Sequence, residues 1–467
     1  MRTSLWSDAG MVRATSAPMN GKLPPGPAAP SLVQTAQLFA DPLGFIRRTH
    51  ARYGDPFTVR LLGVGTIVVT AEPLAMKAIF TADPSELSGA EATKSVAPML
   101  GDRSILLTDG AAHKRLRGLM LPPFHGERMR AYGATMSALA AEAAERLQPG
   151  AELSCYGEMM HVTLGVILSA VFGVHEPSRR AVFQKAVAAL LGSWSPAIQW
   201  FAPLRYDLGP WSPGGRLIRA RRALDALLFE EIARRRTGRG AGEDVLSLLF
   251  DARDEKGEPL SDEELRDQLL TLLLAGHETT ACALSWAMVW LHHEPRTLAR
   301  LRVELDTAGD DAQAITALPY LNAVCQEALR LIPVFPMLVR VAKKPYALRG
   351  ATVPDGALVG ACIYLAHRSP EVFPDAERFR PERFLERKFS PFEFMPFGAG
   401  ARHCLGWAMA LYELKLILAQ LLRHREFELL GEKPTSIEPG EGNLRPVGGG
   451  RFRVAARRSQ QFQGGVA

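Results

Sequence analysis

The middle of the chain places apolar side chains at helical spacing. Ala, Leu, Glu and Arg dominate between residues 70 and 330, and apolar positions recur every three or four residues. The clearest runs are 131–147, 217–235 and 261–291. Ser261 stands three residues before Glu264, which predicts a capping box at the start of the last run. We expect these runs to be helices.

Short runs of β type flank that helical middle. Residues 57–69 carry β-branched side chains on both sides of a Gly63-Val64-Gly65 turn, which predicts a hairpin. Prolines become frequent over 333–396, where brief β-branched runs such as 351–353 appear. A last helix is expected over 407–423. The fold class is therefore mainly α with a minor β region.

The start of the chain contains no apolar run that suits a signal peptide or a membrane anchor. We expect residues 1–22 to be a disordered tail and 23–467 to form a single catalytic domain. The longest apolar stretch, 269–291, is interrupted by the polar segment 276–280. Burying those polar groups in lipid is costly, so we expect no membrane anchor.

Charge and cysteine content exclude some classes of protein. The formal net charge is +6 and the pI about 9.1, a mild excess without a basic stripe interleaved with aromatics. This argues against nucleic acid and fits an acidic protein partner. The five cysteines are scattered and form no C-x-x-C pair, which argues against structural zinc. We expect reduced cysteines, hence a cytoplasmic protein.

One of these cysteines has unusual neighbours. Cys404 follows a glycine-rich turn and precedes Gly406 and the last expected helix. Backbone N–H groups and a helix N-terminus should lower the thiol pKa, and Arg402 is placed to meet an anionic group. Two other interpretations stay open from the cysteine alone. It can be a buried cysteine in a turn, or a nucleophile, although no His/Asn or His/Asp set stands out as its partner.

The segment resembles the haem-binding signature of the cytochrome P450 family, F-x-x-G-x-R-x-C-x-G. Every fixed position is matched, at Phe397, Gly400, Arg402, Cys404 and Gly406. The resemblance implies the family's triangular helical prism around haem b (iron protoporphyrin IX). It also implies Cys404 as the axial metal ligand, with Phe397, Gly398 and Arg402 against the cofactor. A thiolate ligand favours cleavage of the O–O bond.

A second motif lies inside the long apolar helix, at 275–280. Carboxylate and hydroxyl groups there need a reason, and threonine hydroxyls can bond to carbonyls one turn earlier while Gly276 loosens the turn. We expect a groove over a ligand. The segment is similar to the family's oxygen-binding motif, which implies that Ala275 and Gly276 line the cofactor. By the same resemblance Thr279 bonds the oxygen and Glu278 supplies protons.

Two further matches concern charged residues. Glu327 and Arg330 lie three apart in an apolar helix expected over 318–331, and Pro-Glu-Arg-Phe follows about fifty residues later. In the family this pair joins the later arginine, here Arg383, in a buried structural network. A basic helical face and one later arginine fall where the family binds the haem propionates. These residues are His113, Arg117 and Arg340.

The resemblance implies a monooxygenase that inserts one atom of O2 into a lipophilic substrate, by hydroxylation or epoxidation. A fatty acid is our first guess and a terpenoid or polyketide the second, from apolar and aromatic residues in 85–107, 171–211 and 333–339 that could equally be core. Donor-independent rearrangement of peroxides and a non-enzymatic haem sensor are the alternatives.

About sixty residues follow Cys404, against the roughly 100–150 of a further domain. We therefore expect electrons from a separate ferredoxin-type partner and its reductase. Arg387 and Lys388 are candidates for its docking surface. We expect the protein to be a monomer.

Overall fold

The computed structural model describes residues 23–124, 128–238, 242, 244–431, 437–439 and 443–457. The expected tail, 1–22, lies outside the described residues. The helices are α1 (Ser31–Ala40), α2 (Pro42–Tyr53), α3 (Pro73–Thr81), α4 (Gly89–Thr93), α5 (Ala97–Leu100), α6 (Gly110–Met120), α7 (Arg128–Arg146), α8 (Cys155–Val166), α9 (Pro177–Ser193), α10 (Pro196–Trp200), α11 (Pro213–Arg236), α12 (Val245–Asp251), α13 (Asp262–His293), α14 (Pro295–Thr307), α15 (Ala312–Ala317), α16 (Pro319–Leu331), α17 (Ile363–Ala366), α18 (Arg383–Glu386) and α19 (Trp407–His424). The strands are β1 (Phe57–Leu61), β2 (Gly65–Thr70), β3 (Leu87–Ser88), β4 (Glu152–Ser154), β5 (Leu338–Ala342), β6 (Tyr346–Leu348), β7 (Ala351–Val353), β8 (Leu358–Ala361), β9 (Arg425–Leu429), β10 (Ile437–Pro439), β11 (Leu444–Pro446) and β12 (Arg451–Arg457).

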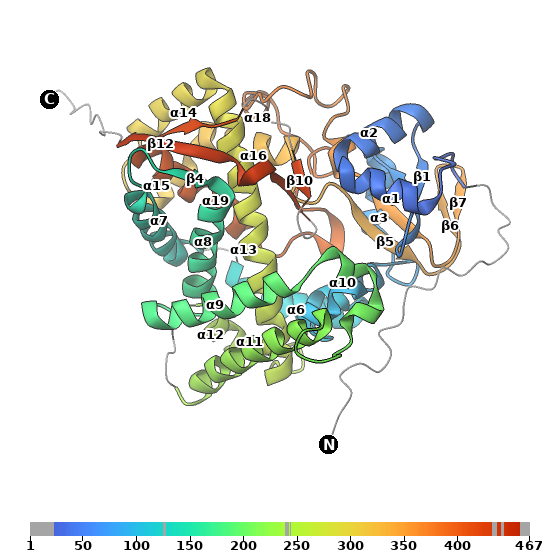
Figure 1. The fold of residues 1–467 in the computed structure, drawn as a ribbon, viewed down its shortest axis with the longest axis horizontal. Coiled ribbons are helices and arrows are strands. Elements are labelled where there is room, and N and C mark those ends of the chain that lie inside the picture. The colour runs from blue at the N-terminus through green and yellow to red at the C-terminus, as the bar shows by residue number, and fades with distance from the viewer. Residues whose placement is uncertain are drawn as a thin grey trace.

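The long helix α13 runs through the middle of the molecule, drawn in yellow in Figure 1. Its start has the expected capping box, in which Ser261 Oγ accepts from the Glu264 N–H at 3.2 Å and Glu264 Oε2 accepts from the Ser261 N–H at 2.9 Å. Every residue from Thr280 to Leu291 is buried. A helix that is buried on all sides forms the core of a large domain, and α8, α11, α16 and α19 pack around this one.

The expected hairpin forms and is part of the largest sheet, whose strand order is β1-β2-β8-β5-β3. Phe57 pairs with Val69 across the hairpin, and β2 continues in parallel pairing with β8. This sheet and the helices α1 and α2 form one side of the molecule, away from the main helical body (Figure 1). The arrangement is mainly helical with small sheets, as the sequence predicted.

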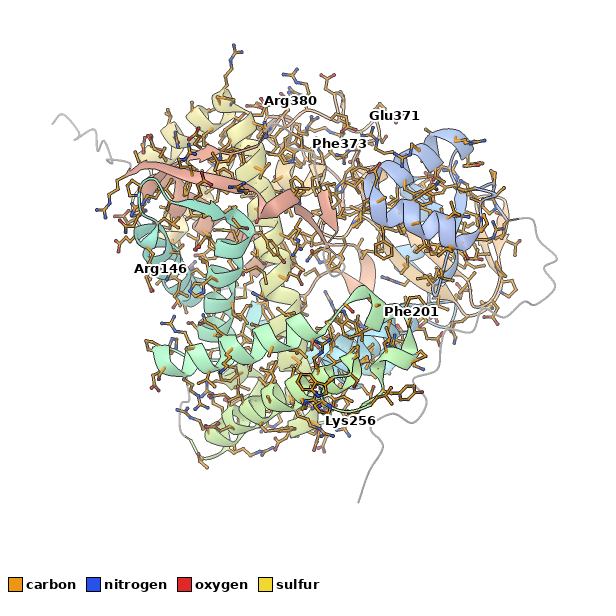
Figure 2. All side chains as sticks on the ribbon, viewed as in Figure 1. Arg146, Phe201, Lys256, Glu371, Phe373 and Arg380 are labelled. Carbon is orange, nitrogen blue, oxygen red and sulfur yellow. The ribbon has the colours of Figure 1, made fainter. Side chains whose placement is uncertain are left out.

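Two features of the fold limit what its surfaces can do. Among the described helices, none combines the length and apolarity needed to cross a bilayer. Side chains fill most of the space between the ribbons (Figure 2). Two exposed residues nevertheless lie among buried ones, one on α13 and one in the loop before α19.

Candidate functional site

The loop before α19 is closed on itself by backbone hydrogen bonds. The Cys404 N–H donates to the Phe397 carbonyl at 3.0 Å, and the Gly398 N–H donates to Met395 at 3.0 Å. Gly400 has φ +70° and faces the Phe80 carbonyl of α3, which would lie 2.1 Å from a Cβ at this position. Only glycine fits both conditions, so the loop is pressed tightly against α3.

The Cys404 side chain is exposed, whereas the other four cysteines are buried. Much protein nevertheless surrounds the sulfur. This burial raises the pKa of the thiol, because it outweighs the opposing effects of the Gly406 N–H and the Arg117 charge. The expectation that the loop alone lowers this pKa is therefore wrong. An exposed group in such crowded surroundings faces an internal space. A bound metal would deprotonate this thiol outright.

The middle of α13 also faces an internal space. Ala275 is exposed although it lies half-way along a central helix, and Thr279 is half-buried one turn later. The threonine hydroxyls bond back as expected, Thr279 to the Ala275 carbonyl and Thr280 to the Gly276 carbonyl at 2.9 Å. The helix is unbroken, however, and a Cβ at Gly276 would lie 2.8 Å from Ile167 Cδ1. Gly276 thus allows α13 to pack closely against Ile167.

A cluster of positive charge lies beside this space. Burial is the main cause that lowers the pKa of His113, which is about 4. The charges of Arg402, Arg117 and Arg340 lower it further, and Asp109 opposes them. Burial also lowers the pKa of Arg340 to about 10. In the described part of the chain, neither Arg117 nor Arg340 has an ion-pair partner.

Arg402 has a carboxylate partner within the chain that no sequence pattern indicated. It forms an ion pair with Asp109 at 2.6 Å and donates to the Thr108 carbonyl. Asp109 in turn accepts from Ser88 Oγ at 2.5 Å. Gly89 leaves room for this arrangement, because a Cβ there would lie 2.4 Å from Arg402 Nε.

These residues fit a haem. The exposed Cys404 thiol supplies a metal ligand, and Ala275 lines the internal space without filling it. Arg117 and Arg340 are half-buried cations without carboxylate partners among the described residues, which is the situation that two propionates would relieve. No cluster of three His, Cys, Asp or Glu side chains in the described residues offers an alternative metal site.

Glu327, Arg330 and Arg383 come together in a buried network behind the loop. Arg330 donates to both carboxylate oxygens of Glu327, at 2.7 and 2.9 Å, and Arg383 Nε donates to Oε1 at 3.1 Å. The Arg380 N–H adds a fourth bond at 2.8 Å. Arg330 also lies over the ring of Phe373, 5.2 Å from its centre; that ring is labelled in Figure 2.

His367 connects this network to the cysteine loop. Its carbonyl accepts from Arg330 Nη1 at 2.9 Å, and its Nε2 accepts from the Met395 N–H at 3.0 Å. Its ring stacks on Phe394 with 5.2 Å between the ring centres. The His367 side chain is fully buried, and burial lowers its pKa to about 3. Met395 accepts from Gly398, so the network supports the loop through one histidine.

Glu278 has a partner that no sequence pattern indicated. Tyr156 on α8 donates its hydroxyl to Glu278 Oε1 at 2.9 Å, across 122 positions of the chain. Local spacing cannot show such a contact. The other missed site residue, Asp109, directly precedes α6, where aspartate is common at the N-terminus of a helix.

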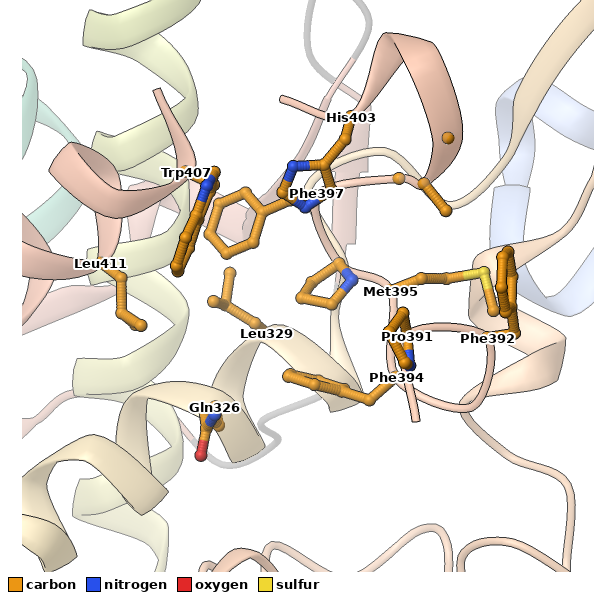
Figure 3. Close-up of a pocket in the computed structure, with 14 residues that line it drawn as sticks. Gln326, Leu329, Pro391, Phe392, Phe394, Met395, Phe397, His403, Trp407 and Leu411 are labelled. Atoms are coloured by element: carbon orange, nitrogen blue, oxygen red, sulfur yellow. The ribbon is translucent and has the colours of Figure 1, made fainter. Parts of the chain in front are cut away.

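A pocket of about 450 Å³ lies against the other side of the loop. Figure 3 shows its aromatic lining, which includes Phe394, Phe397 and Trp407. At its edge, the ammonium of Lys77 lies 5.7 Å from the centre of the Phe392 ring. The pocket is thus apolar inside and has a cation at its edge.

The two cations proposed for docking differ in their surroundings. Arg387 forms an ion pair with Glu393 at 3.2 Å and donates to the Val372 carbonyl, so its charge is largely matched within the chain. Lys388 is exposed and, within the described residues, takes part in no ion pair. Of the two, Lys388 alone has no counter-charge among the described residues.

Comparisons with known proteins agree with this geometry. A family model described as Cytochrome P450 matches residues 22–452. The putative cytochrome P450 135B1 of Mycobacterium bovis is 36% identical, over 93% of this chain and 92% of its own length. The putative cytochrome P450 135A1 of Mycobacterium tuberculosis is also 36% identical, over 86% and 88%. A solved structure of cyanobacterial CYP120A1 with bound retinoic acid has a TM-score of 0.81 and 28% identity, and covers 94% of this chain and 100% of that one.

Proposed function

The chain belongs to the cytochrome P450 family of haem monooxygenases, and we propose that it oxidises a lipophilic substrate with electrons from a separate protein. One atom of O2 enters the substrate and the other leaves as water. The observation that carries the proposal is Cys404. Its side chain is accessible although protein surrounds it, and it lies in a glycine-rich loop closed by backbone hydrogen bonds. Bound haem supplies the redox chemistry through thiolate-ligated iron.

The chain's own residues have three tasks in this proposal. Cys404 holds the metal, while His113, Arg117 and Arg340 bind the propionates together with Arg402. Glu278 and Thr279 deliver protons. Thr279 shares a helical face with the exposed Ala275, four positions earlier. This supports a position of Thr279 next to bound O2. Three further residues line the cofactor and transfer no protons: Phe397, Gly398 and Gly276.

The Glu278–Thr279 pair favours a monooxygenase over a donor-independent enzyme or a haem sensor, since neither of those needs proton delivery. The test is stoichiometry with a surrogate ferredoxin and its reductase. We expect one product molecule for each two electrons and each O2 consumed. Product formation from a peroxide without an electron donor, as fast as with the ferredoxin and its reductase, would favour the peroxide-rearranging enzyme. No product under either condition would favour the haem sensor.

For the substrate we propose a long lipophilic acid. The solved relative carries retinoic acid, an isoprenoid with a carboxylate, which is related to both of our sequence-based guesses. Met99 and Leu100 are buried, whereas Phe201 and Phe335 are 46% and 43% exposed, so the aromatics are not simply core. Titration with dodecanoic acid and with retinoic acid should shift the haem from low to high spin. A shift with neither acid would refute this substrate class.

For the redox partner we propose an acidic ferredoxin that docks at the apolar pocket of Figure 3. The cations Lys77 and Lys388 support this, because both are exposed and neither forms an ion pair among the described residues. Lys388→Glu should slow electron transfer several-fold and weaken its dependence on salt. The control is Lys256→Glu, which changes an exposed charge elsewhere on the surface (Figure 2). Equal rates in both variants would refute the docking site.

We also propose that the protein works as a cytoplasmic monomer. Its five cysteines are all free, which supports a reducing compartment. Sedimentation of the haem-loaded protein at micromolar concentration should give the mass of one chain.

A further inference from the structure

Tyr156 and Glu278 link two helices at the centre of the proposed chemistry. Tyr156 lies in the first turn of α8, and Glu278 lies mid-way along α13, with 2.9 Å between the phenol oxygen and Oε1. Both side chains are half-buried. Burial raises the pKa of Tyr156, and the Glu278 charge raises it further, so the phenol keeps its proton and the carboxylate accepts.

Glu278 lies on α13 beside the face that carries Thr279. Ala275 and Thr279 are four residues apart and share the face toward the internal space. Cys282 follows Ala275 by seven residues and Glu278 by four, so it lies between them on the helix surface, and it donates to the Leu444 carbonyl of β11 at 2.9 Å. Glu278 faces Tyr156 on α8 and lies about 100° around the helix from Thr279.

The surroundings fix Tyr156 as well. The guanidinium of Arg445, the residue after Leu444, lies 5.4 Å from the centre of the Tyr156 ring. Trp286 Nε1 donates to the same Leu444 carbonyl at 2.7 Å, so two side chains of α13 hold β11 in place. The phenol is thus held by its ring on one side and by its hydroxyl on the other. With Oε1 bound by Tyr156, Oε2 is the oxygen left to exchange a proton.

We propose that Tyr156 is a positioning residue for proton delivery, holding the Glu278 carboxylate so that Oε2 serves Thr279. This deepens the proposed function and rests on it. A coupled turnover uses substrate, O2, two electrons and two protons to give hydroxylated product and water. If protons reach the bound oxygen in the wrong place, the same electrons and protons leave with both oxygen atoms as H2O2.

The variant Tyr156→Phe removes only the hydroxyl. We expect it to keep the haem spectrum and the affinity for ligands, because the only side-chain hydrogen bond it removes among the described residues is the one to Glu278. The share of donor electrons recovered as H2O2 should rise at least threefold, and the solvent deuterium isotope effect on donor consumption should increase. Dodecanoic acid and retinoic acid are the probes for both measurements.

Tyr320→Phe is a matched control. Tyr320 donates to Glu382 Oε1 at 2.8 Å, so this variant also removes a tyrosine–glutamate hydrogen bond, but one in which no residue of α13 takes part. It should couple as well as the parent. The double variant Tyr156→Phe with Glu278→Gln should be no more uncoupled than Glu278→Gln alone. Coupling and isotope effects equal to those of Tyr320→Phe would overturn the proposal, as would additive effects in the double variant.

A crystal structure of haem-loaded Tyr156→Phe gives a readout that needs no turnover. We expect the Glu278 carboxylate to leave its present position while Thr279 stays in place. An unmoved carboxylate would overturn the positioning role. This result is independent of the proposed function, whose own failure would appear as a parent protein without thiolate-ligated haem or without oxidised product.

Discussion

The buried network behind the cysteine loop makes a sharp prediction for Glu327→Gln. Glu327 is fully buried and accepts four hydrogen bonds, two from Arg330, one from Arg383 and one from the Arg380 N–H. The variant has nearly the same shape, but it replaces one acceptor oxygen by an NH2 group that faces guanidinium donors. It leaves Arg330 and Arg383 as buried cations without a counter-charge.

The expected loss of unfolding free energy follows from these contacts. Charge-assisted hydrogen bonds contribute about 1.5–3 kcal/mol each, and part of this is offset because a buried carboxylate no longer has to be desolvated. Breaking a buried pair by removing one partner costs about 3–5 kcal/mol, and we expect a loss in this range. Since single domains are stable by only about 5–15 kcal/mol, much less haem-loaded protein should accumulate.

Urea unfolding of the purified protein, followed by circular dichroism and by the haem absorption, measures this loss. Glu142→Gln is the control, because its pair with Arg146 has a separation of 3.3 Å and side chains 58% and 45% exposed. Exposed helical pairs of this kind contribute about 0.3–0.5 kcal/mol. If Glu327→Gln loses no more stability than Glu142→Gln, the reasoning from burial and counter-charge is wrong.

Three further substitutions test other parts of the site. Gly89→Ala would place a Cβ 2.4 Å from Arg402 Nε, so Arg402, which we propose binds a propionate, has to move. Haem transfer to apomyoglobin should become about tenfold faster, which corresponds to about 1.4 kcal/mol. Gly118→Ala is the control, because its Cβ meets nothing within 4 Å and transfer should keep the parent rate. Burial brings the pKa of His367 from 6.5 to about 3, so below pH 6.5 the unfolded chain binds a proton that the folded chain does not. Stability is lost as pH falls through that window, and urea titrations should show a slope smaller by about 1.4 kcal/mol per pH unit in His367→Gln. Burial raises the pKa of Glu413 well above 4.5, so the folded chain keeps a proton that the unfolded chain releases as pH rises. Glu413→Gln should be at least as stable as the parent at pH 8, and a large loss would show that the buried group is charged.

Local patterns in the sequence were sufficient for the elements and for the cysteine loop. The capping box at Ser261 and Glu264 and the hairpin over 57–69 depend on neighbours within a few residues, and both formed as predicted. The spacing of Glu327 and Arg330 likewise indicated a shared helical face. Their burial and the addition of Arg383 came from the family resemblance, since spacing alone does not distinguish a buried pair from an exposed one.

The remaining features depend on contacts between distant segments and on the balance of burial against charge. Arg402 lies 293 positions from Asp109, and Tyr156 lies 122 positions from Glu278, so neither pair leaves a local pattern. The thiol pKa was misjudged for a different reason. The loop does direct the Gly406 N–H at Cys404, but the sequence does not show how much protein surrounds the sulfur.

The spectrum of the reduced protein with carbon monoxide tests the central claim most directly. It should be recorded for the parent and for Cys404→Ser, each purified after expression with a haem precursor. We predict a strongly red-shifted Soret band in the parent, the mark of haem iron with a thiolate ligand, and its loss in Cys404→Ser. An unshifted band in the parent, or a shifted band that survives in Cys404→Ser, would contradict the assignment of Cys404 as the axial ligand.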